Sequence, residues 1–381
     1  MYRELEKTKG QEPGKEMRQN PEQENLLEVK GGFRKEAEDG TRREPEKTFL
    51  QKLEEEIRQE LDRTEAYLAD YLRDPGFGGS VEMILQDLAV SKGKRLRPRL
   101  LLMAGRCGKD FTAVRDRLSR LGALVELVHM ASLIHDDIVD DAPLRRGRMT
   151  TQAKYGKDRA VYAGDLLLSR IVQSLFRDGF HRVGVCFGDA VEAMCLGEIG
   201  QMECRFREDV TVEQYMRNIY GKTAALCRLA CTAGAVESGC EKIVQRHLEE
   251  LGVHFGYMFQ IRDDLLDFTS DTAREGKKTQ TDFREGILTL PVIYAMENPA
   301  YRPELCALLR KAREGSFDRE ESARLVEAVT ASGGIDRAAA DMKMYAQKAL
   351  ESIDILPDSG VRSLFGGLIC GLLRTKADRP S

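Results

Sequence analysis

Two copies of one acidic pattern occur within strongly apolar, helix-like sequence. Residues 136–140 and 263–267 both read D-D-x-x-D. With about 3.6 residues per helical turn, the first and last carboxylates of each copy lie one turn apart on one helix face. Carboxylates at this spacing repel one another and are costly to bury, so folded proteins keep them at helix ends, at the surface or around divalent metals. Because apolar residues flank both copies, we interpret each copy as a cation site.

Basic residues stand on both sides of the first copy. The segment Gly93–Arg99 reads G-K-R-L-R-P-R, and Arg145–Arg148 reads R-R-G-R. Arginine is a planar bidentate donor to phosphate and lysine is a point charge. Mg²⁺ prefers one or two carboxylates together with substrate phosphates. The residues therefore predict a site for Mg²⁺ and one or two diphosphates. No G-x-x-x-x-G-K-[ST] or G-x-G-x-x-G pattern is present, which argues against a nucleotide as the diphosphate carrier.

The composition indicates one large folded region after a charged extension. The chain has 381 residues, of which 42% are hydrophobic, so it can bury a large core. Residues 1–46 are rich in Glu, Lys, Arg, Gln and Gly, and we expect a disordered extension that is not a secretory signal. Residues 47–381 are expected to form the folded domain. No uncharged apolar run is long enough to predict a membrane span.

The net charge and the cysteine content limit which partners and which cellular compartment are expected. The formal net charge of −4 gives no general basic surface for nucleic acid. The nine cysteines include no C-x-x-C pair, and most stand in apolar helical surroundings, where a free thiol behaves as a small hydrophobe. We therefore expect a cytoplasmic protein with reduced cysteines.

Apolar residues repeat at three- and four-residue steps from about residue 47 onward, as at Leu50, Leu53 and Ile57. The same spacing runs from Leu121 to Ile134, directly into the first acidic pattern. Further helices are expected at 158–178, 181–204, 212–238, 241–268, 287–297, 302–313, 318–332, 335–353 and 360–374. The pattern predicts an all-α fold, a single large helical bundle around a central cavity across which the two acidic patterns face each other.

The order and context of these patterns resemble one family, the trans-isoprenyl diphosphate synthases or polyprenyl synthetases. Residues 132–140 (S-L-I-H-D-D-I-V-D) and 259–267 (F-Q-I-R-D-D-L-L-D) match its two aspartate-rich signatures. The resemblance extends from about residue 54 to the C-terminus. It implies a fold of the isoprenoid synthase type and a Mg²⁺-dependent prenyltransferase that condenses isopentenyl diphosphate with an allylic diphosphate.

The resemblance also implies a role for each row of aspartates. In the family, both rows bind Mg²⁺ on the diphosphate of the allylic substrate, which makes Asp136, Asp140 and Asp263 the implied principal ligands. The complete set of implied metal residues is Asp136, Asp137, Asp140, Asp263, Asp264 and Asp267.

Basic and polar residues receive the remaining implied roles. The resemblance places Arg145, Lys222 and Lys277 on the allylic diphosphate. It assigns to isopentenyl diphosphate the residues Lys94, Arg97, His129 and Arg146. Thr223 and Gln260 match positions that line the reacting allylic carbon. The implied catalytic set is therefore Asp136, Asp140, Lys222, Thr223, Gln260, Asp263 and Lys277.

The chain departs from the family pattern at two positions. The family usually has a glycine where Gln280 stands, and a lysine where Ile287 follows Glu285-Gly286. One basic contact to the allylic diphosphate is therefore missing. Because Lys277 and Lys278 remain, we expect weaker binding or a changed balance of substrates rather than loss of activity.

Small residues before the first acidic pattern predict a long product. Ala131 and Ser132 stand where short-chain members of the family typically have aromatic rings, and Val128 lies one turn earlier. A helical turn rises ~5.4 Å, comparable with one isoprene unit, so we expect about six to ten units. Such a product partitions into membranes and suits the side chain of a respiratory quinone.

Several alternatives stay open. A short-chain farnesyl or geranylgeranyl diphosphate synthase would share every motif. A terpene cyclase usually carries one D-D-x-x-D pattern, and a non-catalytic partner subunit commonly loses its aspartates, whereas this chain keeps six. Stretches 181–204 and 212–238 are apolar on more than one face and predict a homodimer, with a heterodimer as the alternative.

Overall fold

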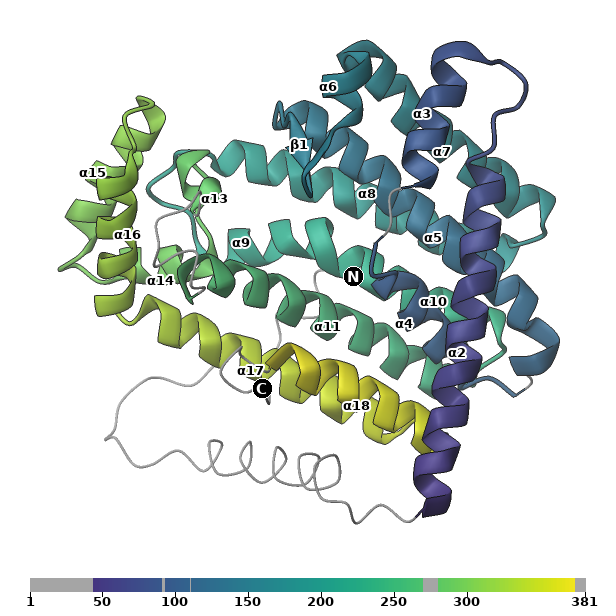
Figure 1. Cartoon of the computed structure of the whole chain (residues 1–381). Helices are drawn as coiled ribbons and strands as arrows, with labels where there is room; N and C mark the ends of the chain where they lie inside the picture. The colour runs from purple at the N-terminus through teal and green to yellow at the C-terminus, as the bar shows by residue number, and fades with distance from the viewer. Residues whose placement is uncertain (1–43, 91–92, 110, 270–279, 374–381) are drawn as a thin grey trace. The chain divides into compact units, whose positions relative to one another are not determined.

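Helices form almost all of the computed structural model (Figure 1), as the spacing of apolar residues predicts. The structure describes residues 44–90, 93–109, 111–269 and 280–373. The α-helices within these ranges are α2 (Glu44–Tyr71), α3 (Gly79–Ala89), α4 (Leu96–Gly105), α5 (Phe111–Val139), α6 (Thr151–Tyr155), α7 (Lys157–Arg177), α8 (His181–Cys204), α9 (Val212–Ile219), α10 (Ala225–Glu237), α11 (Lys242–Thr269), α13 (Thr281–Arg284), α14 (Leu290–Glu297), α15 (Arg302–Arg313), α16 (Arg319–Ala331), α17 (Gly334–Asp354) and α18 (Ser359–Leu373).

Two irregular elements interrupt the helices. The strands β1 (Leu144–Arg145) and β2 (Arg148–Met149) pair antiparallel in a small hairpin. A π-helical turn, η2 (Tyr220–Ala224), joins α9 to α10. Residues 1–43 of the predicted extension lie outside the described ranges, and α2 begins at Glu44. The residues from Thr48 onward form one compact unit.

The centre of this unit is built from helices that are apolar on all sides. Every residue of α5 from Leu121 to Val128 is buried. Helix α10 packs against α4, α11, α8 and α5, and Figure 1 shows it between α8 and α11. A helix that is apolar on all sides belongs in the interior. The apolar faces of α10 are therefore covered within the chain, so the dimer prediction draws no support from the stretch 212–238.

Helix α8 differs from α10 because it keeps apolar side chains in solvent. Val185, Leu196 and Ile199 are 72%, 62% and 52% exposed. The neighbouring helix α7 adds Phe176, which is 70% exposed. The two helices therefore carry unpartnered apolar surface.

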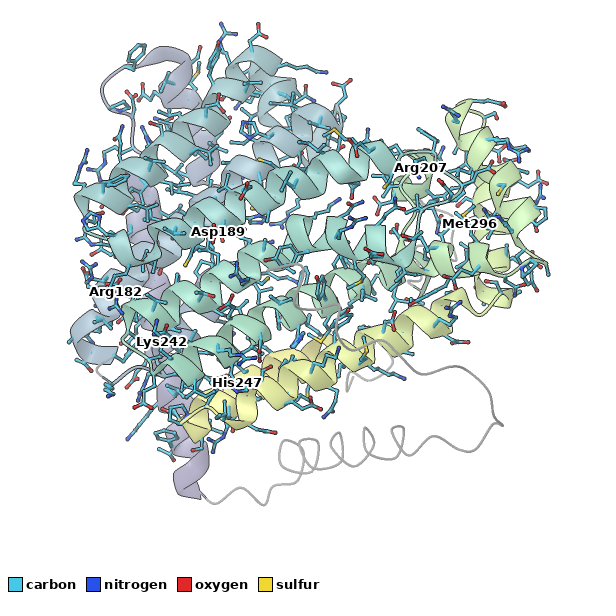
Figure 2. All side chains as sticks on the ribbon, turned by 180° about the vertical axis from the view of Figure 1, so that it is seen from behind. Arg182, Asp189, Arg207, Lys242, His247 and Met296 are labelled. Atoms are coloured by element: carbon cyan, nitrogen blue, oxygen red, sulfur yellow. The ribbon has the colours of Figure 1, made fainter. Side chains whose placement is uncertain are left out.

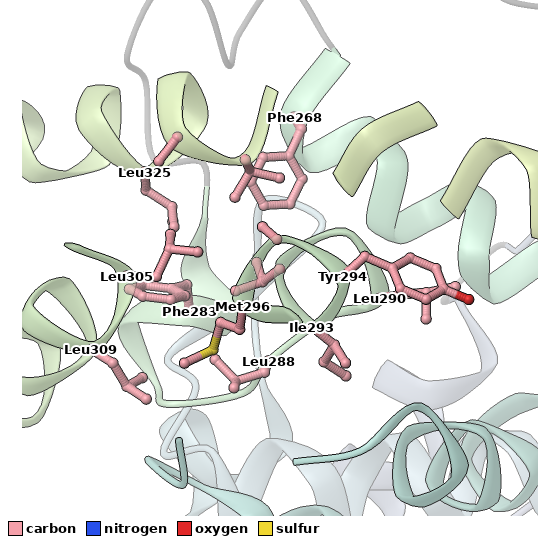
Figure 3. Close-up of a cluster of buried hydrophobic side chains, with 14 of the residues drawn as sticks. Phe268, Phe283, Leu288, Leu290, Ile293, Tyr294, Met296, Leu305, Leu309 and Leu325 are labelled. Atoms are coloured by element: carbon pink, nitrogen blue, oxygen red, sulfur yellow. The ribbon is translucent and has the colours of Figure 1, made fainter. Parts of the chain in front are cut away.

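An apolar cluster supports the segment that follows α13. Phe268 of α11 belongs to the same cluster as Phe283, Leu288 and Leu290 (Figure 3). Residues 290–296 of α14 are all buried. This anchoring fixes residues 281–289 beside the second acidic pattern.

Helices that cross a membrane are long and apolar along their length. None of the helices within the described ranges combines the length and the apolar character of a membrane-crossing helix.

Candidate active site

The first acidic pattern lies at the C-terminal end of α5, where the helix ends at Val139. Burial raises the pKa of Asp136 to about 7, and the nearby carboxylates of Glu198 and Asp140 add to the increase. Lys222 and Arg145 act in the opposite direction. Asp136 therefore lies in a crowded, partly desolvated carboxylate group that a bound cation would stabilise.

The other two aspartates of the first pattern are paired with arginines. Arg145 Nε donates to Asp137 Oδ1 at 2.7 Å, and Asp137 is buried. The β1–β2 hairpin carries Arg145 to this position. An arginine beyond the end of α8, Arg205, contacts Asp140 Oδ1 at 3.0 Å. The protein thus balances the charge of Asp137 and Asp140 with its own cations.

The second acidic pattern lies near the C-terminal end of α11 and is more deeply buried. Asp264 is only 4% exposed and accepts hydrogen bonds from Tyr215 Oη at 2.7 Å and Gln260 Nε2 at 2.9 Å. Burial raises the pKa of Asp264 to about 7 although both hydrogen bonds lower it. Asp264 is therefore held by neutral donors.

Asp263 and Asp267 lie among other acids. Burial raises the pKa of Asp267 to about 6, and Asp282 and Asp263 add to the increase. Burial and Asp282 also raise the pKa of Asp263, against Arg262 and Lys222. Asp282, at the start of α13, thus acts on the whole second pattern, and the sequence analysis had missed it.

Lys222 connects the two acidic patterns electrostatically. Desolvation lowers the pKa of Lys222, but Glu198, Asp282, Asp136 and Asp264 outweigh this effect and raise it. Asp136 belongs to the first pattern and Asp264 to the second, so both patterns surround one cation. Aspartates of both patterns therefore lie within electrostatic range of Lys222.

The π-helical turn η2 explains how Lys222 and its neighbour both contact residues of adjacent helices. Lys222 Nζ donates to Gln201 Oε1 of α8 at 3.1 Å. Thr223 Oγ1 donates to Gln260 Oε1 at 2.6 Å. A π-turn widens the helix locally, and such turns are frequent at functional sites. A Cβ at Gly221 would lie only 2.3 Å from the carbonyl oxygen of Ala193, so the glycine permits the close approach of η2 and α8.

A small cavity, with a volume of about 30 Å³, opens to solvent beside the second pattern. Residues of α8, α9, η2, α11, α13 and the segment after α13 line it, among them Gln201, Lys222, Gln260, Asp264, Asp282 and Ile287. Within the described ranges, no three His, Cys, Asp or Glu side chains are grouped closely enough to hold a metal by themselves. A cation there would need additional oxygen ligands, such as those of a phosphate.

A second polar region lies around His129. Burial lowers the pKa of His129 to about 2, and Arg97, Arg146, Arg145 and Arg95 add to the decrease. The imidazole is therefore neutral and stands within reach of several guanidinium groups. This region gathers three of the four residues expected to bind isopentenyl diphosphate, and Lys94, the fourth, is exposed near the start of α4.

Two arginines of this region behave differently. Arg95 is buried and pairs with Glu65 and with Glu126, the latter at 2.7 Å. Its charge is therefore used inside the fold. Arg97 Nε is buried without a hydrogen-bond partner in the described part of the chain. An unsatisfied buried donor is costly, so Arg97 is the arginine better suited to an anionic ligand.

The two departures from the family pattern have different surroundings. Gln280 has a φ of 56°, in the left-handed region where glycine is favoured. Its Nε2 donates to the carbonyl oxygen of Asp267 at 2.8 Å, and Ser322 Oγ donates to its Oε1 at 2.5 Å. Ile287 adds no charge to the cavity wall. Lys277 and Lys278, predicted to remain available, lie outside the described residues.

Comparisons with known proteins identify the family of the chain. The polyprenyl synthetase family matches residues 80–328. A heptaprenyl diphosphate synthase component 2 from Bacillus subtilis is 34% identical over 271 residues, which are 71% of this chain and 76% of that protein. Octaprenyl diphosphate synthase from Escherichia coli is 34% identical over 277 residues, 72% of this chain and 84% of that protein.

Solved structures of both long- and short-chain enzymes have the same fold. A decaprenyl diphosphate synthase from Rhodobacter capsulatus gives a TM-score of 0.76 at 29% identity, covering 85% of this chain and 98% of that chain. A geranylgeranyl pyrophosphate synthase from Lactobacillus brevis gives 0.75 at 29% identity, covering 84% and 97%. With its family match, its relatives and its paired acidic patterns, the chain belongs to the polyprenyl synthetase family.

Proposed function

We propose that this protein is a Mg²⁺-dependent polyprenyl diphosphate synthase that condenses isopentenyl diphosphate with an allylic diphosphate. The observation that carries the proposal is the convergence of both acidic patterns on Lys222, with a separate arginine-rich region around His129. One anionic substrate would bind the carboxylates through Mg²⁺ together with Lys222, and the other would bind the arginine-rich region directly.

The crowded carboxylates fit Mg²⁺. The three principal ligands that we assign are Asp136, Asp140 and Asp263. Burial and neighbouring acids raise the pKa of Asp136 and Asp263, so a divalent cation would relieve an existing cost. When bound there, Mg²⁺ would neutralise negative charge on the leaving diphosphate. Substrate phosphate oxygens would have to complete its coordination, because no three protein ligands are grouped closely enough among the described residues.

The remaining residues bind and orient the substrates. Arg145, Lys222 and Lys277 are assigned to the allylic diphosphate, where positive charge stabilises the pyrophosphate that leaves with the electrons of the C–O bond. The isopentenyl double bond then forms a new C–C bond to the allylic carbon. Loss of a proton to the released pyrophosphate restores an alkene.

Thr223 and Gln260 are assigned to the reacting carbon. Their hydrogen bond directs both side-chain oxygens into a fixed arrangement. Fixed dipoles of this kind stabilise developing positive charge without reorganising during the reaction.

An elongation assay tests the proposal. Farnesyl diphosphate and Mg²⁺ are supplied with and without isopentenyl diphosphate, and the products are identified by mass spectrometry. Elongation that requires both Mg²⁺ and isopentenyl diphosphate supports the proposal. Cyclisation of farnesyl diphosphate alone indicates a terpene cyclase, and no reaction indicates a non-catalytic subunit.

The division between the two substrates has its own test. The double variant Lys94→Ala/Arg97→Ala should raise the KM for isopentenyl diphosphate much more than the KM for farnesyl diphosphate. The reason is that Lys94 and Arg97 are assigned to isopentenyl diphosphate alone. Equal increases in both constants would show that the assignment of His129 and its neighbours is wrong.

The product is assigned as a long chain of about six to ten isoprene units, because each ~5.4 Å turn of α5 without a large side chain leaves space for one more unit. Ala131 and Val128 on this path are small, and both are buried. Relatives named heptaprenyl, octaprenyl and solanesyl diphosphate synthases support this length. Ala131→Phe should shorten the products toward fifteen or twenty carbons. A wild-type product already that short would refute the assignment.

We assign a homodimer as the working form, supported by the exposed Val185, Leu196 and Ile199 of α8 and Phe176 of α7. The relatives called component 2 make a second, different subunit the alternative. Light scattering at micromolar concentration should give twice the chain mass. A monomer would refute the homodimer. The nine cysteines, most of them buried, support a reducing, cytoplasmic compartment.

A further inference from the structure

The turn that follows α8 lies against the segment that carries Ile287. Phe206 has a φ of 57°, and its backbone N–H donates to the carbonyl oxygen of Gly286 at 2.8 Å. A Cβ at Gly286 would lie about 2.5 Å from the Phe206 ring, so the two segments are in close contact. Arg205 precedes Phe206 and Ile287 follows Gly286, so these two residues flank the backbone hydrogen bond.

Arg205 is surrounded by carboxylates of the candidate site. Its guanidinium contacts Asp140 Oδ1 at 3.0 Å. Its charge also lowers the pKa of Glu198 and of Glu285, although burial raises both values. Arg205 thus lies between the first acidic pattern on α5 and the turn before Ile287.

The guanidinium of Arg205 has donor capacity left. Its Nε is buried and has no hydrogen-bond partner among the described residues. A guanidinium presents five N–H donors in a rigid fork that matches phosphate geometry. A buried, unsatisfied donor next to a metal-type carboxylate indicates an anionic ligand that the contacts of the free protein do not supply.

The cavity wall lacks a cation at the neighbouring position. Ile287 lines the cavity together with Lys222, Asp264 and Asp282, and its side chain cannot contact phosphate by charge. From these contacts we propose that Arg205 binds the diphosphate of the allylic substrate and supplies, from the end of α8, the charge that Ile287 does not. This inference rests on the proposed function.

The contact between Arg205 and Asp140 also accounts for the role of Arg205 before a ligand binds. Without a ligand, Arg205 balances the charge of Asp140. A diphosphate offers Arg205 more acceptor oxygens than one carboxylate does, and charge-assisted bidentate bonds to phosphate are strong. Arg205 then exchanges Asp140 for the substrate, which releases Asp140 for Mg²⁺.

Calorimetric titration with farnesyl S-thiolodiphosphate and Mg²⁺ tests the proposal, because this analogue retains the diphosphate and ionises slowly. Arg205→Gln should weaken binding of the analogue about tenfold or more, the loss expected for a charged hydrogen-bonding group. Binding of isopentenyl diphosphate should change less than twofold. Arg207→Gln is the matched control because Arg207, labelled in Figure 2, lies on the same turn and pairs with the exposed Asp209.

The variant Arg205→Gln/Ile287→Lys provides the rescue. A lysine at residue 287 should restore most of the lost affinity, which a merely structural role of Arg205 would not allow. Wild-type affinity in Arg205→Gln, an equal loss in Arg207→Gln, or no rescue by Ile287→Lys would each overturn the inference. Circular dichroism checks that every variant is folded. Failure of the wild-type protein to bind the analogue would overturn the proposed function and the inference together.

Discussion

The two acidic patterns have the same spacing but different electrostatic surroundings. In the first, Arg145 pairs with Asp137 and Arg205 pairs with Asp140. In the second, Asp264 is held by the neutral side chains of Tyr215 and Gln260. No salt bridge within the described ranges reaches the second pattern, and Asp282 adds a further negative charge to it.

This difference shows that spacing alone does not set the charge balance of a D-D-x-x-D pattern. In the first pattern, two of the three carboxylates are paired with arginines before any ligand binds. The second stores repulsion among buried carboxylates, which a cation would relieve. We therefore expect the two patterns to respond differently to substitution although both serve one site.

The largest expected effect is on turnover. Asp136→Asn and Asp263→Asn should each lower kcat by about a hundred- to a thousandfold, because each removes a carboxylate that would hold the Mg²⁺ neutralising the leaving diphosphate. Neither should unfold the protein, since each relieves repulsion. Asp141→Asn is the control because Asp141 pairs with Lys157 outside the site. Steady-state kinetics at saturating Mg²⁺ measures kcat for each variant. Wild-type turnover in either site variant would contradict the assignment of the metal ligands.

A smaller effect is expected on folding stability at the second pattern. Tyr215→Phe removes a buried hydrogen bond to Asp264 and should lower the free energy of unfolding by about 1–2 kcal/mol. Tyr220→Phe, whose ring contacts Tyr257, is the control and should change it by less than about 0.5 kcal/mol. Urea denaturation measures both. Equal changes in the free energy of unfolding for the two variants would mean that the hydrogen bond from Tyr215 to Asp264 does not stabilise the fold.

The smallest effect distinguishes the last aspartate of each pattern. In metal-free protein at pH 8, Asp267→Asn should raise the melting temperature by about 1–3 °C because it removes repulsion from Asp282 and Asp263. Asp140→Asn should leave it unchanged or lower it slightly, because a partly exposed ion pair with Arg205 is lost.

The pH dependence has a definite sign. The pKa of Asp267 is raised to about 6, so its favourable contribution to stability is fully present below its ordinary pKa and is lost as pH rises through 6. The gain from Asp267→Asn should therefore be complete at pH 8 and only about half as large at pH 5, which lies between the ordinary pKa of 3.8 and the raised value. Calorimetry at the two pH values decides this, and a gain of equal size at both would contradict the assignment.

Much of the fold could be predicted from local periodicity. The expected stretches 181–204 and 302–313 coincide with α8 and α15. Apolar residues at three- and four-residue steps lie on one face only when the segment is an α-helix. The stretch 287–297 begins three residues too early. Gly286 has a φ of 79°, and Thr289 is extended before α14, so backbone conformation rather than hydrophobicity sets that boundary.

The irregular elements could not be predicted from periodicity. The β1–β2 hairpin has only two residues per strand, too few to show alternation. The π-turn at Lys222 depends on the contact of Gly221 with Ala193 and Gly197, which exists only after folding.

The candidate site was predicted where charge is repeated and missed where it is isolated. The aspartate rows and basic clusters stand out as patterns. Glu198, Asp282 and Arg205 belong to no repeated pattern in the sequence, and only folding places them beside Lys222 or Asp140. The spacing of Glu198 and Gln201, three residues apart on one helix face, was the available signal for α8.

The central claim is that both acidic patterns serve one site, and a double-variant cycle in kcat tests it most directly. If Asp136 and Asp263 act on the same diphosphate, Asp136→Asn/Asp263→Asn should be no more than about tenfold slower than the slower single variant, because residues that act as a unit are strongly non-additive. Losses that multiply, so that the double variant shows the product of the two single losses, would contradict the account.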